Sequence, residues 1–167
     1  MEPLIGIIVG SKSDLKHVED CTAVLDEFGV PYEVVVASAH RSPDFLTRKL
    51  AELDSQVLVY IAIAGMAAHL PGVVASQTVK PVVGVPVSVS LQGLDALLSI
   101  VQMPSGVPVG AMAIDGAKNA AIYSIGILAA TEAGKALKLG DKLTEMRAKR
   151  AAEIEEDSQL GFGKIRV

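Results

Sequence analysis

Five short apolar runs, separated by segments of helical periodicity, constrain the fold of this chain more than any other feature. The runs span residues 4–9, 32–37, 57–64, 81–85 and 109–114. Helical patterns between and after them predict helices at residues 15–28, 43–53, 71–78, 94–101 and 117–130. Strands that are apolar throughout and alternate with helices indicate βαβ units around a parallel sheet covered on both faces. We therefore expect an α/β fold, a three-layer α/β/α sandwich with a central parallel sheet and right-handed crossovers.

The length of 167 residues is enough for one domain with one sizeable core. No linker or internal repeat divides the chain, so we expect residues 1–167 to form a single domain. The segment 142–157 is rich in charge and predicts a C-terminal helix, with the last residues as a tail. This helix either packs on a neighbouring subunit or is an ordinary solvated amphipathic helix.

The charge balance argues against several classes of protein. A net charge of −4 and the lack of a basic cluster do not suit a nucleic-acid backbone. Gly and Pro interrupt the apolar stretches every few residues, which argues against a membrane span. The single cysteine, Cys21, excludes an internal disulfide, and no basic region precedes the first strand as in a secretory signal. We expect a soluble cytoplasmic protein.

The middle of the chain is poor in charge. Between residues 55 and 114 the only acidic or basic residues are Lys80 and Asp95. Because monomers rarely expose large apolar patches, we expect part of this segment to be buried against other subunits.

Ligands of an open parallel sheet bind outside the carboxyl ends of its strands, and three turns of this sequence lie there. The first is Gly10-Ser11-Lys12-Ser13-Asp14, which opens a helix and can attract an anion such as phosphate. Asp14 is a suitable acceptor for ribose hydroxyls. The alternative is that Ser13 or Asp14 only caps the helix. The spacing matches neither a Walker loop nor the dinucleotide fingerprint.

The second turn holds Ser38, His40 and Arg41 and leads to a helix that Ser42 is expected to cap, with Pro43 in its first position. An arginine suits bidentate contact with phosphate, and an imidazole titrates near neutral pH, so this turn can hold an anion and move a proton. The alternative is a helix cap with a surface arginine.

The third turn, residues 65–72, carries His69 among small residues, where it serves either a close-fitting ligand or the local structure through a hydrogen bond. His17 is expected to be solvated on the charged side of the first helix. The histidines and the lone cysteine give no zinc pattern.

Six segments, in this order, resemble the class I PurE family of N5-carboxyaminoimidazole ribonucleotide mutases. They are Gly-Ser-Lys-Ser-Asp at 10–14, Ser-Ala-His-Arg-Ser-Pro-Asp at 38–44, Ala-Ala-His-Leu-Pro-Gly at 67–72, Pro-Val-Val-Gly-Val-Pro-Val at 81–87, Gly-Leu-Asp-Ala-Leu-Leu-Ser-Ile-Val-Gln-Met-Pro at 93–104 and Gly-Val-Pro-Val at 106–109. The resemblance runs from about residue 5 to residue 130 and implies a flavodoxin-like fold and a homo-octamer. It implies conversion of N5-carboxyaminoimidazole ribonucleotide to its 4-carboxy isomer without ATP, metal or organic cofactor.

The resemblance also implies roles for individual residues. His40 would be the general acid and base, and His69 would line the pocket that holds the migrating carboxyl group. The residues implied to bind the nucleotide substrate are Ser11, Asp14, Ser38, Arg41, Gly65, Ala67 and His69.

The chain departs from the family pattern at two positions. Family members usually have Gly-Ala-Gly-Gly where this chain has Ile63-Ala64-Gly65-Met66. The class II relatives are aminoimidazole ribonucleotide carboxylases that use free carbon dioxide; they usually carry Lys in place of Arg41 and lack the Ala-Ala-His-Leu-Pro-Gly run. This chain resembles class I at both places. The carboxylase, a lyase, is the alternative, and a nucleotide-binding protein without chemistry would not need His40.

Overall fold

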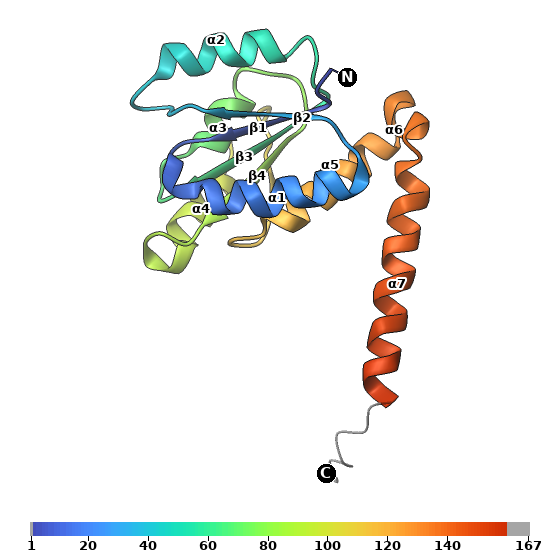
Figure 1. Ribbon diagram of the computed structural model, residues 1–167. Helices are drawn as coiled ribbons and strands as arrows, with labels where there is room; N and C mark the ends of the chain where they lie inside the picture. The colour runs from blue at the N-terminus through green and yellow to red at the C-terminus, as the bar shows by residue number, and fades with distance from the viewer. Residues whose placement is uncertain (1, 160–167) are drawn as a thin grey trace.

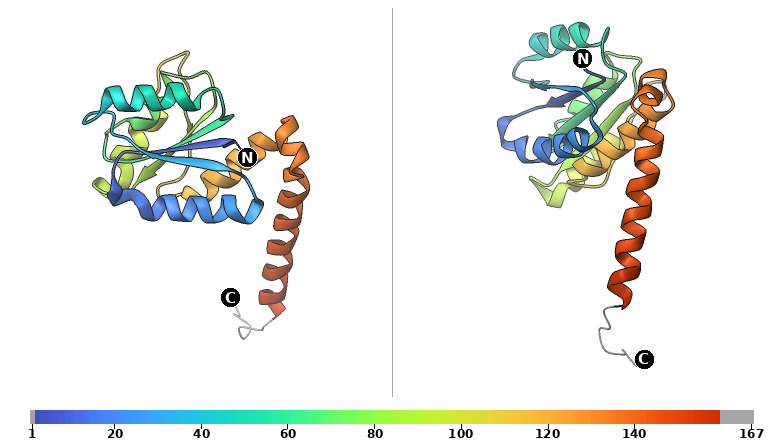
Figure 2. Two further views of the ribbon diagram at one scale, coloured as in Figure 1. Left: turned by 45° about the horizontal axis from the view of Figure 1, so that its top comes forward. Right: turned by 45° about the vertical axis from the view of Figure 1, so that its right-hand side comes forward.

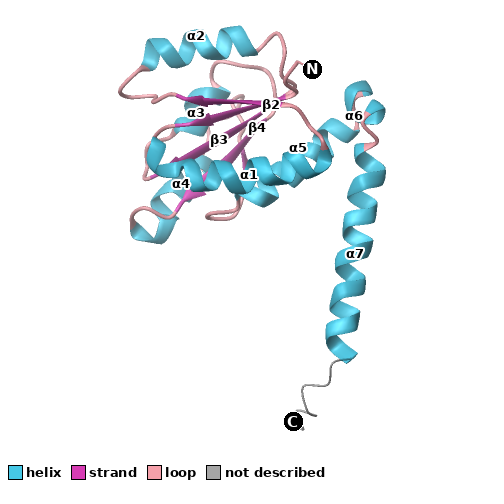
Figure 3. Ribbon diagram, in the orientation of Figure 1, coloured by secondary structure: helices cyan, strands magenta, loops and turns pink. Residues whose placement is uncertain are grey.

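The computed structural model describes residues 2–159 and shows a parallel sheet between layers of helices (Figures 1 and 3). The sheet has five strands in the order β2-β1-β3-β4-β5. The strands are β1 (Ile5–Val9), β2 (Tyr32–Val36), β3 (Val59–Gly65), β4 (Val82–Val87) and β5 (Gly110–Ala111). All of the pairings between them are parallel. This order is the doubly wound, flavodoxin-like one, so the predicted fold class is confirmed.

The helices lie close to where the periodicity predicts them. They are α1 (Leu15–Phe28), α2 (Pro43–Leu53), α3 (Leu70–Ala75), α4 (Leu94–Val101), α5 (Ala117–Ala129), α6 (Glu132–Ala136) and α7 (Leu139–Gln159). The α1 helix ends where Gly29 takes a left-handed conformation, with φ of 68°. The short α6 was not predicted, and α7 is longer than the predicted segment 142–157. The predicted C-terminal tail, residues 160–167, lies outside the described residues.

Strand β5 is shorter than the predicted segment 109–114. Only Gly110 and Ala111 pair in register with β4, because the chain after them leaves the regular strand spacing and advances three residues for two residues of β4. The chain stays beside β4 after the strand ends: the Met112 amide donates to the Gly84 carbonyl at 2.9 Å and the Asp115 amide to the Pro86 carbonyl at 2.8 Å.

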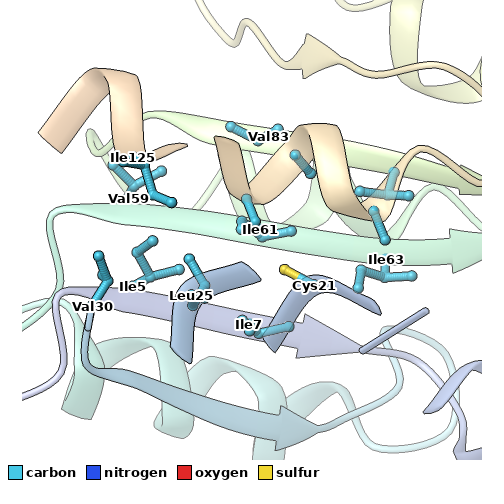
Figure 4. Close-up of a cluster of buried hydrophobic side chains, with 14 of the residues drawn as sticks. Ile5, Ile7, Cys21, Leu25, Val30, Val59, Ile61, Ile63, Val83 and Ile125 are labelled. Atoms are coloured by element: carbon cyan, nitrogen blue, oxygen red, sulfur yellow. The ribbon is translucent and has the colours of Figure 1, made fainter. Parts of the chain in front are cut away.

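One face of the sheet packs against α1 and α5 (Figure 4). The odd-numbered residues of β1, β3 and β4 point to this face, and the register aligns Ile7 with Ile61 and Ile61 with Val83 across these three strands. Cys21 and Leu25 of α1 fill the space above them, both with 0% exposure. Burial raises the pKa of the Cys21 thiol to about 12, so this thiol is a core residue rather than a nucleophile.

The opposite face packs against α2 and α3, with Leu46, Leu50 and Leu70 among the buried contacts. Tyr60 lies here with its hydroxyl donating to the Leu50 carbonyl at 3.2 Å. Its ring occupies the place of a side chain at Gly6, where a Cβ would lie 2.8 Å from the ring.

The last helix, α7, extends away from the three layers (Figure 2). Leu139 at its start is buried, and the Lys142 ammonium donates to the Phe28 carbonyl at 2.7 Å, which ties the helix to the end of α1. From Arg147 to Ser158 every residue is exposed. Within the described part of the chain, no helix combines the length and apolar character needed to cross a membrane.

Candidate active site

A cavity of about 430 Å³ opens at the carboxyl ends of the strands. These strand ends lie at the left edge of the sheet in Figure 1. It lies at the point where the strand order reverses between β1 and β3, which is the usual ligand site of this architecture. The residues that line it are Gly10, Ser11, Ser13, Asp14, Ser38, Ala39, His40, Arg41, Ala64, Gly65, Met66, Ala68, Leu70 and Val89.

The turn after β1 brings Ser11 and Asp14 to the cavity. The Ser11 hydroxyl caps the short 3₁₀ helix η1 (Lys12–Asp14) by accepting from the Ser13 amide at 3.3 Å. Asp14 begins α1 but its carboxylate makes no capping bond to that helix. The carboxylate accepts from the Ser13 hydroxyl at 3.0 Å, and the residue is only 7% exposed. A carboxylate so placed can accept further hydrogen bonds from a ligand in the cavity.

The turn after β2 is held by a compact hydrogen-bond network. The Ser38 hydroxyl accepts from the Arg41 amide at 3.2 Å and from Arg41 Nε at 3.4 Å. Arg41 Nη2 donates to the Gly10 carbonyl at 3.1 Å, so the guanidinium bridges the turns after β2 and β1. His40 lies between Ser38 and Arg41, exposed and on the cavity wall.

The predicted capping role of Ser42 is wrong, although Pro43 does occupy the first turn of α2. Ser42 lies at the N-cap position, but its hydroxyl makes no bond to the helix. It accepts from the Ser38 amide at 3.1 Å and donates to the Ser38 carbonyl at 3.3 Å. The hydroxyl therefore stabilises the site turn instead of the helix end.

The turn after β3 contributes Gly65, Met66 and Ala68 to the cavity, whereas Ala67 and His69 are not among the lining residues. His69 is directed toward α4, where its Nδ1 lies 2.7 Å from the Ser99 carbonyl oxygen. Because a carbonyl only accepts, Nδ1 carries the proton in this arrangement. In the single chain the ring makes the structural hydrogen bond that the sequence left as an alternative, and its role at the pocket stays a prediction.

The two residues that depart from the family pattern, Ile63 and Met66, lie in different environments. Ile63 is fully buried in the core between the sheet and α1. Met66 is 54% exposed, lines the cavity and has a φ of 55°. The left-handed conformation costs a residue with a Cβ about 1–2 kcal/mol. Local packing therefore accommodates Ile63, whereas Met66 lies on the cavity wall.

Two features of this region were not predicted from the sequence: the position of Val89 and the environment of His17. Val89 follows β4 and lines the cavity as a lone valine in no recognisable motif. His17 is half-buried rather than solvated, with its Nε2 3.6 Å from an Asp115 carboxylate oxygen that also accepts from the Ser88 amide at 2.9 Å. No local pattern predicts a partner so far along the chain.

Within residues 2–159, the structure contains no group of three or more His, Cys, Asp or Glu side chains that could hold a metal ion.

Comparison with known proteins agrees with this architecture. The family model described as AIR carboxylase matches residues 4–153. The chain belongs to the AIR carboxylase family. Two relatives named N5-carboxyaminoimidazole ribonucleotide mutase are similar to this chain along nearly their whole length. The protein from Pyrococcus horikoshii is 50% identical, with 96% of this chain and 92% of that protein covered, and the one from Methanocaldococcus jannaschii is 51% identical, with 94% and 99% covered.

A longer relative and a solved structure are also similar to this chain. The phosphoribosylaminoimidazole carboxylase of Schizosaccharomyces pombe is 54% identical over 76% of this chain, but only 23% of that protein is covered. The crystal structure of Treponema denticola PurE superimposes with a TM-score of 0.84 at 28% identity, over 96% of this chain and 99% of that one. The predicted resemblance to the PurE family is confirmed.

Proposed function

We propose that this chain is an isomerase of purine biosynthesis that converts N5-carboxyaminoimidazole ribonucleotide into 4-carboxyaminoimidazole ribonucleotide. The observation that carries the proposal is the near full-length match, at 50% and 51% identity, to relatives named N5-carboxyaminoimidazole ribonucleotide mutase. A cavity of about 430 Å³ is of a size that suits a small nucleotide.

The proposed binding roles follow the chemistry of the turns. Ser11 and Asp14 contact the phosphate and ribose of the nucleotide, and Ser38 and Arg41 contact the phosphate. Two observations support this assignment. The Arg41 guanidinium is held by its bond to Gly10, and both residues line the cavity. The Asp14 carboxylate is buried and has one hydroxyl partner. Gly65, Ala67 and His69 remain proposed parts of the pocket for the carboxyl group.

In the proposed reaction, His40 moves one proton in each direction. The bond between the exocyclic nitrogen and the carboxyl carbon breaks, its electron pair stays on nitrogen, and the His40 imidazolium protonates that nitrogen as carbon dioxide forms. The ring carbon C4 then attacks carbon dioxide, a C–C bond forms, and neutral His40 removes the proton from C4. Imidazole suits both steps because its pKa normally lies near neutral pH.

A second candidate is the carboxylase reaction, in which aminoimidazole ribonucleotide combines with free carbon dioxide. The Schizosaccharomyces pombe relative, 54% identical over 129 residues, is named a carboxylase and favours this alternative. The mutase remains the proposal because the relatives matched along nearly their whole length carry that name.

A paired assay separates the two candidates. One reaction receives the N5-carboxy nucleotide, and the other receives aminoimidazole ribonucleotide with abundant bicarbonate. We expect enzyme-dependent 4-carboxy product only in the first reaction. Comparable enzyme-dependent rates in the second would move the assignment to the carboxylase, and binding without turnover in both would indicate a nucleotide-binding protein.

The proton role of His40 is tested by His40→Asn, which keeps a polar group of similar size. We expect kcat to fall by roughly 10²–10⁴-fold, the usual contribution of a general acid or base, while the Kd for the nucleotide changes little. Calorimetric titration with the product measures binding separately from turnover. Near-normal activity in this variant would assign the proton transfer to another group.

We also propose a cytoplasmic homo-octamer, with α7 packing on a neighbouring subunit. Support comes from apolar residues exposed on η2 (Leu91–Gly93) and α4: Leu91 is 75% exposed, Leu94 is 52% exposed and Val101 is 49% exposed. These residues lie in the charge-poor segment, where burial between subunits would remove apolar surface from water. Sedimentation equilibrium at working concentration checks this, and a monomer would overturn it.

A further inference from the structure

The cavity has a polar end and an apolar end. Ser11, Ser38 and Arg41 lie after β1 and β2, whereas Gly65, Met66 and Val89 lie after β3 and β4. The strand order β2-β1-β3-β4 therefore separates the two groups along the edge of the sheet. A nucleotide whose phosphate lies among the hydroxyls and the guanidinium directs its base toward the apolar end.

Met66 is the unusual residue of the apolar end. It is held at a φ of 55°, a conformation that residues with a Cβ rarely adopt, and its side chain is 54% exposed on the cavity wall. Core packing does not explain the residue, since the buried contacts of this strand end are made by Ile63 and Ala64. Strained backbone of this kind concentrates at ligand sites.

Val89 lines the same end and packs directly against the backbone before Met66. A Cβ on Gly65 would lie 2.4 Å from Val89 Cγ2, so the absence of a side chain at Gly65 is what lets the valine approach. Two apolar side chains from neighbouring strand ends therefore line the part of the cavity where the base is expected.

We propose that Met66 is a specificity-determining residue that covers the apolar end of the cavity and decides whether carbon dioxide is recaptured or escapes. The inference rests on the proposed mutase function. After the N–C bond breaks, the carbon dioxide is neutral and small, and no charge holds it in place. A flexible, polarizable thioether can pack against the imidazole ring and exclude water above it.

The two fates of the intermediate give different products. If C4 captures carbon dioxide, the carboxyl group is retained and the proton from C4 passes to His40. If carbon dioxide leaves, aminoimidazole ribonucleotide is released with the proton that His40 gave to nitrogen, and His40 takes a new proton from solvent. The ratio of the two products therefore measures retention without depending on the overall rate.

The experiment compares wild type with Met66→Gly and Met66→Ala. Each reaction is supplied with N5-carboxyaminoimidazole ribonucleotide and quenched at high pH, and both products are separated by chromatography after subtraction of the enzyme-free decarboxylation. We expect the released fraction of aminoimidazole ribonucleotide to rise about tenfold in both variants, the effect of losing a small apolar contact. Met66→Leu keeps the bulk and is expected to stay near the wild-type ratio.

Lys138→Gly is the matched control. Lys138 is exposed, lies between α6 and α7 away from the cavity, and has a φ of 54°. This change removes the same backbone strain without altering the cavity, so we expect an unchanged product ratio. An equal increase in the control would overturn the proposal.

Three further outcomes are decisive. An unchanged ratio in Met66→Gly and Met66→Ala, with wild type forming the 4-carboxy product, overturns the Met66 proposal alone. Dissociation of the oligomer in Met66→Gly, seen by sedimentation, also overturns it, because Met66 would then be an interface residue. If wild type forms no 4-carboxy product at all, the proposed function fails and the Met66 proposal fails with it.

Discussion

Replacing Gly72 with alanine tests whether the His69 ring is fixed in the orientation described. A Cβ on Gly72 would lie 2.2 Å from both Cε1 and Nε2 of His69, and the three nearest atoms all belong to that ring. Carbon atoms pack at about 3.5–4.0 Å, so the ring must move. It is held by the hydrogen bond from Nδ1 to the Ser99 carbonyl, so movement breaks or stretches that bond.

The change in the free energy of unfolding expected for Gly72→Ala combines opposing effects. Overpacking of this kind costs about 1–3 kcal/mol, and the lost hydrogen bond costs about 1 kcal/mol. Alanine in place of glycine within a helix contributes about 0.5–1 kcal/mol in the stabilising direction, and Gly72 lies inside α3. We expect Gly72→Ala to lower the free energy of unfolding by about 1–3 kcal/mol.

The effect is expected to change sign when the ring is removed. In a His69→Ala background the clash is absent, so Gly72→Ala should stabilise by about 0.5–1 kcal/mol. The coupling free energy of the double-mutant cycle is then about 1.5–4 kcal/mol. Gly126→Ala in α5 is the control, because a Cβ there meets nothing within 4 Å and the helix preference alone should stabilise.

Urea unfolding at a fixed subunit concentration measures the four proteins of the cycle and the Gly126→Ala control, because the concentration of an oligomer affects its apparent stability. The free energies are compared at a common m-value. An equal cost of Gly72→Ala in both backgrounds would refute the reasoning, because it would mean that the His69 ring does not occupy the space beside Gly72.

Two further predictions concern ionisation and charge. Burial raises the pKa of the Cys21 thiol to about 12, whereas in the unfolded state the thiol loses its proton above its ordinary pKa of about 8.5. The native state therefore holds one more proton than the unfolded state between these two pH values, and the free energy of unfolding falls as pH rises between them. The urea midpoint should therefore drop more between about pH 8 and about pH 10 in wild type than in Cys21→Ala, and equal drops would contradict the assignment. Arg41→Lys should raise KM at least about tenfold with a smaller change in kcat, because an ammonium cannot match the planar guanidinium at a phosphate. Initial rates over a range of substrate concentrations check this, and an unchanged KM would remove Arg41 from the binding site.

The fold was predictable from the sequence because its signals are local. Apolar strands such as Ile5–Val9 are buried on both faces, so they need no pairing information to be recognised. The end of α1 follows from Gly29, and the start of α2 follows from Pro43. Family membership was also predictable, because the six motifs are specific and occur in order.

The errors come from contacts that the residue pattern alone does not show, and for His17 and Val89 these contacts join distant parts of the chain. Ser42 is a residue type that often caps helices, but its hydroxyl makes two hydrogen bonds to the Ser38 backbone within the turn instead. His17 pairs with Asp115, a partner that only the folded sheet brings near α1. Val89 lines the cavity because Gly65 leaves room for it, a relation between two strand ends that no periodicity reveals.

The bridge formed by Arg41 has a consequence for the thermodynamics of binding. The guanidinium has five N–H donors, and the bonds to Ser38 and Gly10 fix its plane while leaving other donors available. A long side chain that is already ordered loses little rotamer freedom when an anion arrives, whereas a free one gives up about 0.5–1.5 kcal/mol. The turns after β1 and β2 thus form a preorganised anion receptor. The Arg41 side chain loses its rotamer freedom when the chain folds, so this entropy is not lost again when an anion binds.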